Sequence, residues 1–179
     1  MDSSAVTRVA VVSGGGTGMG RAIAARLAGD GDYVLIIGRR AGVLEAAAEE
    51  LSAAGPGQVS WQAADLTRPQ DVERVAASVE GSVDVLVNNA GGVASRGMPE
   101  TQLAEVARAW EADYQSNVIS AVLLTQALLP RLRRPGGRVV NISSIAALRG
   151  GGGSYSAAKG RCSGGPSTWP PTSGRPGLP

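Results

Sequence analysis

Histidine is absent from this 179-residue sequence, and cysteine occurs only once, as Cys162. This scarcity excludes Ser–His and Cys–His nucleophilic catalysis, histidine-ligated metal sites and any intrachain disulfide bond. Any chemistry that the chain performs must therefore use Tyr, Lys, Ser, Asp or a bound cofactor, and we expect no metal site.

The sequence also lacks a long apolar run and a strong excess of charge. No stretch approaches the ~20 consecutive apolar residues of a membrane-spanning helix, and the apolar run at 9–12 is too short for a signal peptide. Because Arg161 and Arg175 lie near the C-terminus, residues 1–159 carry 15 basic and 15 acidic side chains. We therefore expect a cytoplasmic protein that binds neither membranes nor nucleic acid.

Short apolar segments alternate with segments of helical pattern along most of the chain. The apolar segments have the character of buried strands and span 8–12, 33–38, 59–66, 83–91 and 136–144. The helical patterns span 21–31, 43–55, 69–81 and 101–134. This alternation predicts the α/β class, with a doubly wound parallel sheet of the Rossmann-like type.

A glycine-rich turn, with Gly14, Gly18 and Gly20, separates the first predicted strand from the first predicted helix. Glycines at this point allow a tight turn and a close approach of the backbone to a pyrophosphate, which the N-terminus of the helix stabilises. The alternative is a glycine-rich loop that only turns the chain. Its position between strand and helix favours nucleotide binding.

Arg39 and Arg40 follow the end of the second predicted strand, where dinucleotide folds often place a carboxylate that binds ribose hydroxyls. A guanidinium in place of the carboxylate favours a 2′-phosphate, hence NADP over NAD. The alternative is that both arginines are solvated charges at the entry of a helix. Asp65, after the third predicted strand, can bind the adenine amino group or cap the next turn.

Further motifs follow in a fixed order: NNAG (88–91), Asn117, Ser144 and YSAAK (155–159). Together with the glycine turn and Asp65, they resemble the short-chain dehydrogenase/reductase family over residues 6–159. The resemblance implies a Rossmann-fold oxidoreductase, homo-oligomeric when intact, that uses a nicotinamide cofactor on a small carbonyl or alcohol. It implies the catalytic residues Asn117, Ser144, Tyr155 and Lys159, and the cofactor-binding residues Ser13, Gly14, Gly18, Met19, Gly20, Arg39, Asp65, Leu66, Asn89, Ala90 and Gly91, with Tyr155 and Lys159 again.

The YSAAK stretch places Tyr155 and Lys159 one helical turn apart, on one face. A carbonyl that accepts hydride needs a proton, which a tyrosine can deliver, and a neighbouring ammonium favours the phenolate. The family resemblance further implies that Lys159 binds the nicotinamide ribose, that Ser144 polarises the substrate carbonyl and that Asn117 holds a water. Because only eleven positions separate Ser144 from Tyr155, fewer than the family leads us to expect, Ser143 is an alternative for the carbonyl contact.

The composition changes after Lys159. Residues 160–179 contain five glycines and five prolines and are predicted to form a disordered tail after a dinucleotide-binding domain at 1–159. The family continues with further strands at this point, so we expect a fold that lacks its last strands. The codons of STWPPTSG (167–174), read in another frame, permit a helical family-like sequence, which suggests the hypothesis of a frameshift after Lys159.

The tail bears on the expected activity. Because Gly160 follows Lys159 directly, we expect the Tyr155 helix to end there and to fray, and this chain to show little or no dehydrogenase activity. Two alternatives to an NADP-dependent oxidoreductase follow: a catalytically dead fragment that still binds nucleotide, and a regulatory protein that senses dinucleotides.

Overall fold

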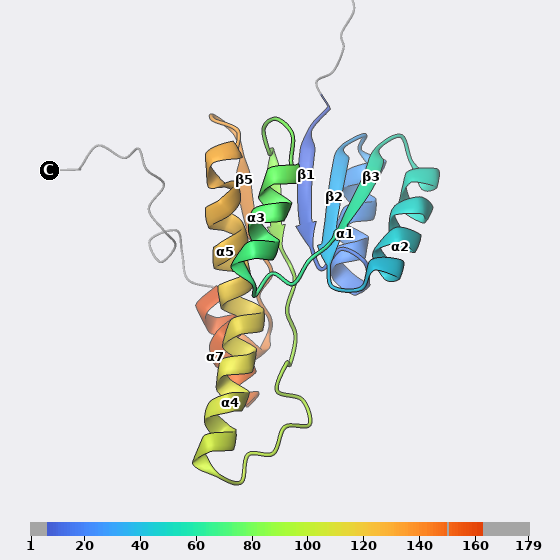
Figure 1. The fold of residues 1–179 in the computed structure, drawn as a ribbon. Coiled ribbons are helices and arrows are strands. Elements are labelled where there is room, and N and C mark those ends of the chain that lie inside the picture. The colour runs from blue at the N-terminus through green and yellow to red at the C-terminus, as the bar shows by residue number, and fades with distance from the viewer. Residues whose placement is uncertain (1–6, 150, 163–179) are drawn as a thin grey trace, which may run out of the picture.

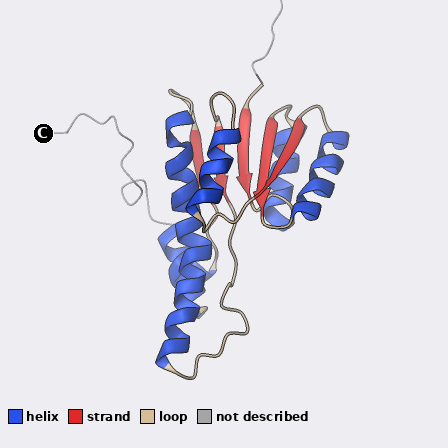
Figure 2. Ribbon diagram, in the orientation of Figure 1, coloured by secondary structure: helices blue, strands red, loops and turns tan. Residues whose placement is uncertain are grey.

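The computed structural model describes residues 7–149 and 151–162, which form a five-stranded sheet with helices on both faces (Figures 1 and 2). All neighbouring strands are parallel, in the order β3-β2-β1-β4-β5. The strands are β1 (Val9–Ser13), β2 (Tyr33–Gly38), β3 (Gln58–Ala63), β4 (Val85–Asn88) and β5 (Arg138–Asn141). The predicted doubly wound parallel sheet is confirmed.

The helices follow the predicted order. They are α1 (Gly18–Gly29), α2 (Ala41–Ala54), α3 (Pro69–Ser78), α4 (Leu103–Tyr114), the π-helix η1 (Gln115–Ile119), α5 (Ser120–Leu128), the 3₁₀-helix η2 (Leu129–Arg131), α6 (Ala146–Arg149) and α7 (Gly153–Cys162). The helical pattern at 101–134 thus becomes α4 and α5, joined by a π-turn. None of the helices in the described ranges is long and apolar enough to cross a membrane.

Successive side chains of the central strands enter two separate cores. Val12 and Ile36 pack with the helices α1 and α2 on one face of the sheet. Val11 and Ile37, their neighbours along the chain, pack with α3 and α5 on the other face. Because both faces are covered, these strands are apolar at every position rather than at alternate positions.

Helix α7 corrects one expectation from the sequence. It does not end at Lys159 but continues through Gly160 to Cys162. A glycine inside a helix costs about 1 kcal/mol relative to alanine, but Ala158 and Cys162 pack against Val118 of η1 and bury this face of α7. Residues 160–162 therefore belong to the helix, and the rest of the predicted tail lies outside the described residues.

Candidate functional site

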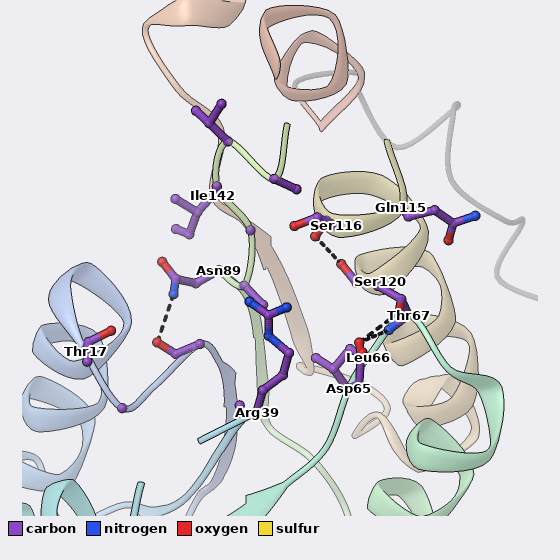
Figure 3. A pocket seen from close by; sticks show the side chains of 18 of the residues that line it. Thr17, Arg39, Asp65, Leu66, Thr67, Asn89, Gln115, Ser116, Ser120 and Ile142 are labelled. Carbon is purple, nitrogen blue, oxygen red and sulfur yellow. Dashed lines mark hydrogen bonds between the residues drawn. The ribbon is translucent and has the colours of Figure 1, made fainter. Parts of the chain in front are cut away.

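A cleft of about 900 Å³ opens at the carboxyl ends of the strands (Figure 3). Residues that follow each of the five strands line it, and α4, η1 and α7 close one side. Figure 1 shows α4 and α7 extending beyond this end of the sheet. In open parallel sheets, this edge is where ligands bind.

The glycine turn between β1 and α1 forms one wall of the cleft. Gly14 has a φ of +68°, in the left-handed region that favours glycine. A Cβ atom at Gly20 would lie 2.2 Å from the carbonyl oxygen of Gly14, so only glycine allows the first turn of α1 to approach this closely. The side chain of Thr17 does not cap α1. The N-terminus of α1 thus has the character of an anion-binding site.

Arg39, directly after β2, reaches into the cleft between the glycine turn and the segment of Asp65 and Thr67 (Figure 3). Asp65 Oδ1 accepts hydrogen bonds from the backbone N–H and the hydroxyl of Thr67, at 3.1 and 2.8 Å. Burial opposes ionisation of Asp65, but these hydrogen bonds and the charges of Arg39 and Arg68 hold its pKa below the ordinary value. Asp65 therefore caps the turn and also lines the cleft as an anion.

Ser13, for which the sequence predicts a cofactor contact, is not among the residues that line the cleft. Its buried hydroxyl donates to the carbonyl oxygen of Val87 and accepts the N–H groups of Asn89 and Ala90, the last two at 3.0 Å. Asn89 in turn donates from Nδ2 to the carbonyl oxygen of Ser13. Ser13 therefore joins β1 to the segment that follows β4 and positions Asn89 and Ala90, which do line the cleft.

The opposite wall carries Tyr155 and Lys159 of α7, which both line the cleft. The ammonium of Lys159 donates to the carbonyl oxygen of Ile142, 3.0 Å away, and the Ser143 hydroxyl donates to the carbonyl oxygen of Lys159. A Cβ at Gly91 would clash with Asn117 Oδ1 and would lie 3.3 Å from Lys159 Nζ. The residues after β5 thus hold α7, and the absence of a side chain at Gly91 leaves room chiefly for the amide of Asn117.

Asn117 is buried behind Gly92 of this wall, and neither Asn117 nor Ser144 lines the cleft. The side chain of Asn117, in η1, exchanges two hydrogen bonds with the backbone of Gly92. The backbone carbonyl oxygen of Asn117 accepts the thiol of Cys162. The hydroxyl of Ser144 accepts the N–H of Ala146. Ser143, the alternative from the sequence, lies in the cleft instead.

The structure brings most of the predicted site residues together. Those that line the cleft are Gly14, Met19, Arg39, Asp65, Leu66, Asn89, Ala90, Gly91, Tyr155 and Lys159; those that do not are Ser13, Gly18, Gly20, Asn117 and Ser144. Sequence reasoning missed Thr17, Val93, Ala94, Ala112, Gln115, Ser116 and Ser120, which also line it. No local motif marks the α4 and η1 residues, because only the fold brings these helices to the strand ends.

The family model for short chain dehydrogenases matches residues 8–164. This chain belongs to the short-chain dehydrogenase family. The resemblance read from the order of its motifs is thereby confirmed.

Individual oxidoreductases are similar over most of this chain. An uncharacterised oxidoreductase of Mycobacterium tuberculosis (strain CDC 1551 / Oshkosh) is 39% identical over 142 residues, which cover 76% of this chain and 52% of the relative. The structure of L-sorbose reductase from Gluconobacter frateurii, complexed with NADPH and L-sorbose, superposes with a TM-score of 0.76 at 30% identity, over 90% of this chain and 62% of that one. A xylitol dehydrogenase bound to NAD⁺ superposes with a TM-score of 0.74 at 25% identity, over 86% of this chain and 60% of that one. This chain thus spans between 52% and 62% of the length of these relatives.

Proposed function

We propose that this short-chain dehydrogenase binds NADP in the cleft and transfers hydride between NADPH and a small carbonyl or alcohol substrate. The proposal rests on one observation above all: Arg39 and the pair Tyr155 and Lys159 line the same cleft. The cleft therefore offers a phosphate-binding group and a proton-transferring group to one ligand.

The residues of the cleft fit a dinucleotide. The N-terminus of α1, which Thr17 does not cap, is suited to a pyrophosphate, and the Arg39 guanidinium to a 2′-phosphate. When bound, the cofactor supplies the hydride. NADPH and NAD⁺ each occur in a related structure, so we base the preference for NADP on Arg39.

The chain's own residues would move the proton. Tyr155 would donate its hydroxyl proton to the carbonyl oxygen that becomes an alcohol, acting as general acid. Lys159, one turn further along α7, would favour the phenolate that remains and bind the ribose. Ser143 lines the cleft and Ser144 does not, so we assign the contact with the substrate carbonyl to Ser143, whose hydroxyl would have to turn from the carbonyl oxygen of Lys159 to donate to the substrate. Asn117, to which the resemblance gives a water-holding role, does not line the cleft, and its amide is bonded to the backbone of Gly92.

Titration of the full chain with NADPH and NADH, followed by cofactor fluorescence, tests the cofactor preference. Arg39→Ala should weaken NADPH binding by about 10- to 100-fold, as for the loss of one or two charge-assisted hydrogen bonds, and leave NADH binding nearly unchanged. Arg74→Ala is the matched control, since Arg74 pairs with Asp71 on α3 and does not line the cleft. Equal or tighter binding of NADH by the unaltered chain would contradict the assignment to Arg39.

Turnover of NADPH with a panel of small aldehydes and ketones separates the oxidoreductase from the two alternatives. A nucleotide-binding fragment or a dinucleotide sensor would bind NADPH without oxidising it. One reason for expecting little activity was a helix ending at Lys159, and the continuation of α7 to Cys162 removes that reason. The cytoplasmic location and the homo-oligomeric state remain predictions from the sequence.

A further inference from the structure

Asp113 of α4 is a fully buried carboxylate to which neither the family motifs nor the proposed mechanism gives a role. It lies one helical turn before Asn117 and close to the start of α7. An isolated buried charge is strongly unfavourable, so a buried carboxylate must be paired or hydrogen-bonded. The partners of Asp113 therefore indicate what it does.

Four hydrogen bonds reach the Asp113 carboxylate from two other segments. Oδ1 accepts the backbone N–H groups of Ala94 and Ser95, at 2.6 and 3.1 Å. Oδ2 accepts the hydroxyls of Ser95 and Ser154, at 2.8 and 2.6 Å. Ser95 and Ser154 are themselves buried. One carboxylate thus joins α4, the segment after β4 and the first turn of α7.

Asn117 extends this connection towards β4. Asn117 Oδ1 accepts the N–H of Gly92, and Asn117 Nδ2 donates to the carbonyl oxygen of Gly92. Nδ2 also donates to the backbone carbonyl oxygen of Asp113. The segment 92–95 is therefore held at both ends by one face of α4 and η1. Val93 and Ala94, which lie between these ends, line the cleft.

The arrangement favours the ionised form of Asp113. Burial alone would raise its pKa, but the hydrogen bonds from Ser154, Ser95 and the two backbone N–H groups outweigh it, and the pKa lies below the ordinary value. Charge-assisted hydrogen bonds of this kind are short and strong. The Ser154 bond, at 2.6 Å, joins the residue directly before Tyr155 to this charge.

We propose that Asp113 is a positioning residue that docks the start of α7 through Ser154 and thereby holds Tyr155 at the reacting carbonyl. The inference rests on the proposed function, in which Tyr155 delivers the proton. A displacement of about 1 Å in a reacting group can cost on the order of a hundredfold in rate. A short helix of ten residues needs such a contact because it is marginally stable by itself.

Two serine variants separate this role from general stabilisation. Ser154→Ala removes the bond between Oδ2 and α7, and Ser95→Ala removes a bond of the same kind to the same oxygen without touching α7. In the full chain with NADPH and a panel of small aldehydes and ketones, Ser154→Ala should lower kcat by about 10- to 100-fold and change KM for NADPH by less than about twofold. Ser95→Ala should leave kcat close to that of the unaltered chain. Ser154→Thr, which keeps the hydroxyl, should recover most of the lost kcat.

Hydrogen exchange of the α7 amides, measured on the same proteins without ligand, gives a second readout. Exchange at 155–159 should be faster in Ser154→Ala than in Ser95→Ala or the unaltered chain. Equal kcat in the two alanine variants, or equal exchange of α7 in both, would overturn the positioning role. If the unaltered chain binds no dinucleotide, or binds it without turnover, the proposed function fails, and the exchange comparison alone decides whether Asp113 docks α7.

Discussion

The two walls of the cleft are built in different ways. The wall with the glycine turn, here called the cofactor wall, takes its shape within a short stretch of chain: Gly20 lies against Gly14, six positions apart. Asn89 then ties this turn to the end of β4 through a bond to Ser13. The opposite wall, with Tyr155 and Lys159, is here called the catalytic wall. It takes its shape from hydrogen bonds between distant segments: Asn117 and Gly92 are 25 positions apart, and Ser154 and Asp113 are 41 apart. The first wall can therefore be recognised from a motif, and the second can be recognised only from the fold.

The two walls should also contribute differently to function, one mainly to dinucleotide binding and the other mainly to turnover. Changes in the cofactor wall should alter dinucleotide binding and local stability. Changes at Tyr155 and at the residues that position it should alter kcat and leave dinucleotide binding nearly unchanged, whereas changes at Lys159, which would also bind the ribose, should affect both. The following predictions test this division.

The largest effect is expected on the catalytic wall, from Tyr155→Phe. The phenol to phenyl change removes the transferable proton and little contact area, so turnover should fall by about 10²- to 10⁴-fold while the dissociation constant for NADPH changes little. Steady-state kinetics and NADPH titration of the full chain measure the two quantities. Tyr114→Phe is the control, since Tyr114 is exposed on α4 and does not line the cleft. A similar loss of turnover in both variants would show that Tyr155 has no special role.

On the cofactor wall, Gly20→Ala should be the most damaging small change. The added methyl group would lie 2.2 Å from the Gly14 carbonyl oxygen, so α1 must shift away from the glycine turn. We expect a loss of about 1–3 kcal/mol in unfolding free energy, as for overpacked sites, together with weaker NADPH binding. Gly29→Ala, at the other end of α1, meets no atom within 4 Å and should be neutral or slightly stabilising. Denaturant unfolding of both variants measures the difference, and equal stabilities would contradict the close approach of Gly20 to Gly14.

The smallest effect concerns the pH dependence of stability. The folded pKa of Asp113 lies below its ordinary value of 3.8, so its contribution to stability is complete above that pH and is lost as the pH falls through the folded pKa. Asp113→Asn should therefore be less stable than the unaltered chain at neutral pH, and the gap should narrow in acid. The pKa values of Asp65, Asp71 and Glu105 are also lowered. These groups change the stability of both proteins equally, so they cancel in the difference. Unfolding free energies measured at a series of pH values test this, and a gap that stays constant into acid would contradict the ionised network.

Much of the fold follows from the sequence because its signals are local. Apolar runs between helical patterns predicted the parallel sheet, and its strands pack on both faces as such runs require. The glycine turn, Arg39 and the YSAAK stretch likewise each sit beside a strand end or within one helix. Neighbouring residues in the sequence determine where the backbone turns at these sites. Because the carboxyl ends of parallel strands lie at one edge of the sheet, these motifs then lie at the cleft.

Tertiary contacts decided the rest. Ser13 faces Val87 rather than the cleft, and Asn117 lies behind the wall, because each side chain is held by a segment distant in sequence. Ser143 rather than Ser144 lines the cleft because β5 ends against α7. Helix α7 passes Gly160 because burial of Ala158 and Cys162 against η1 outweighs the low helix propensity of glycine. Propensity and motif act over a few residues, whereas burial depends on which segments the whole fold brings together.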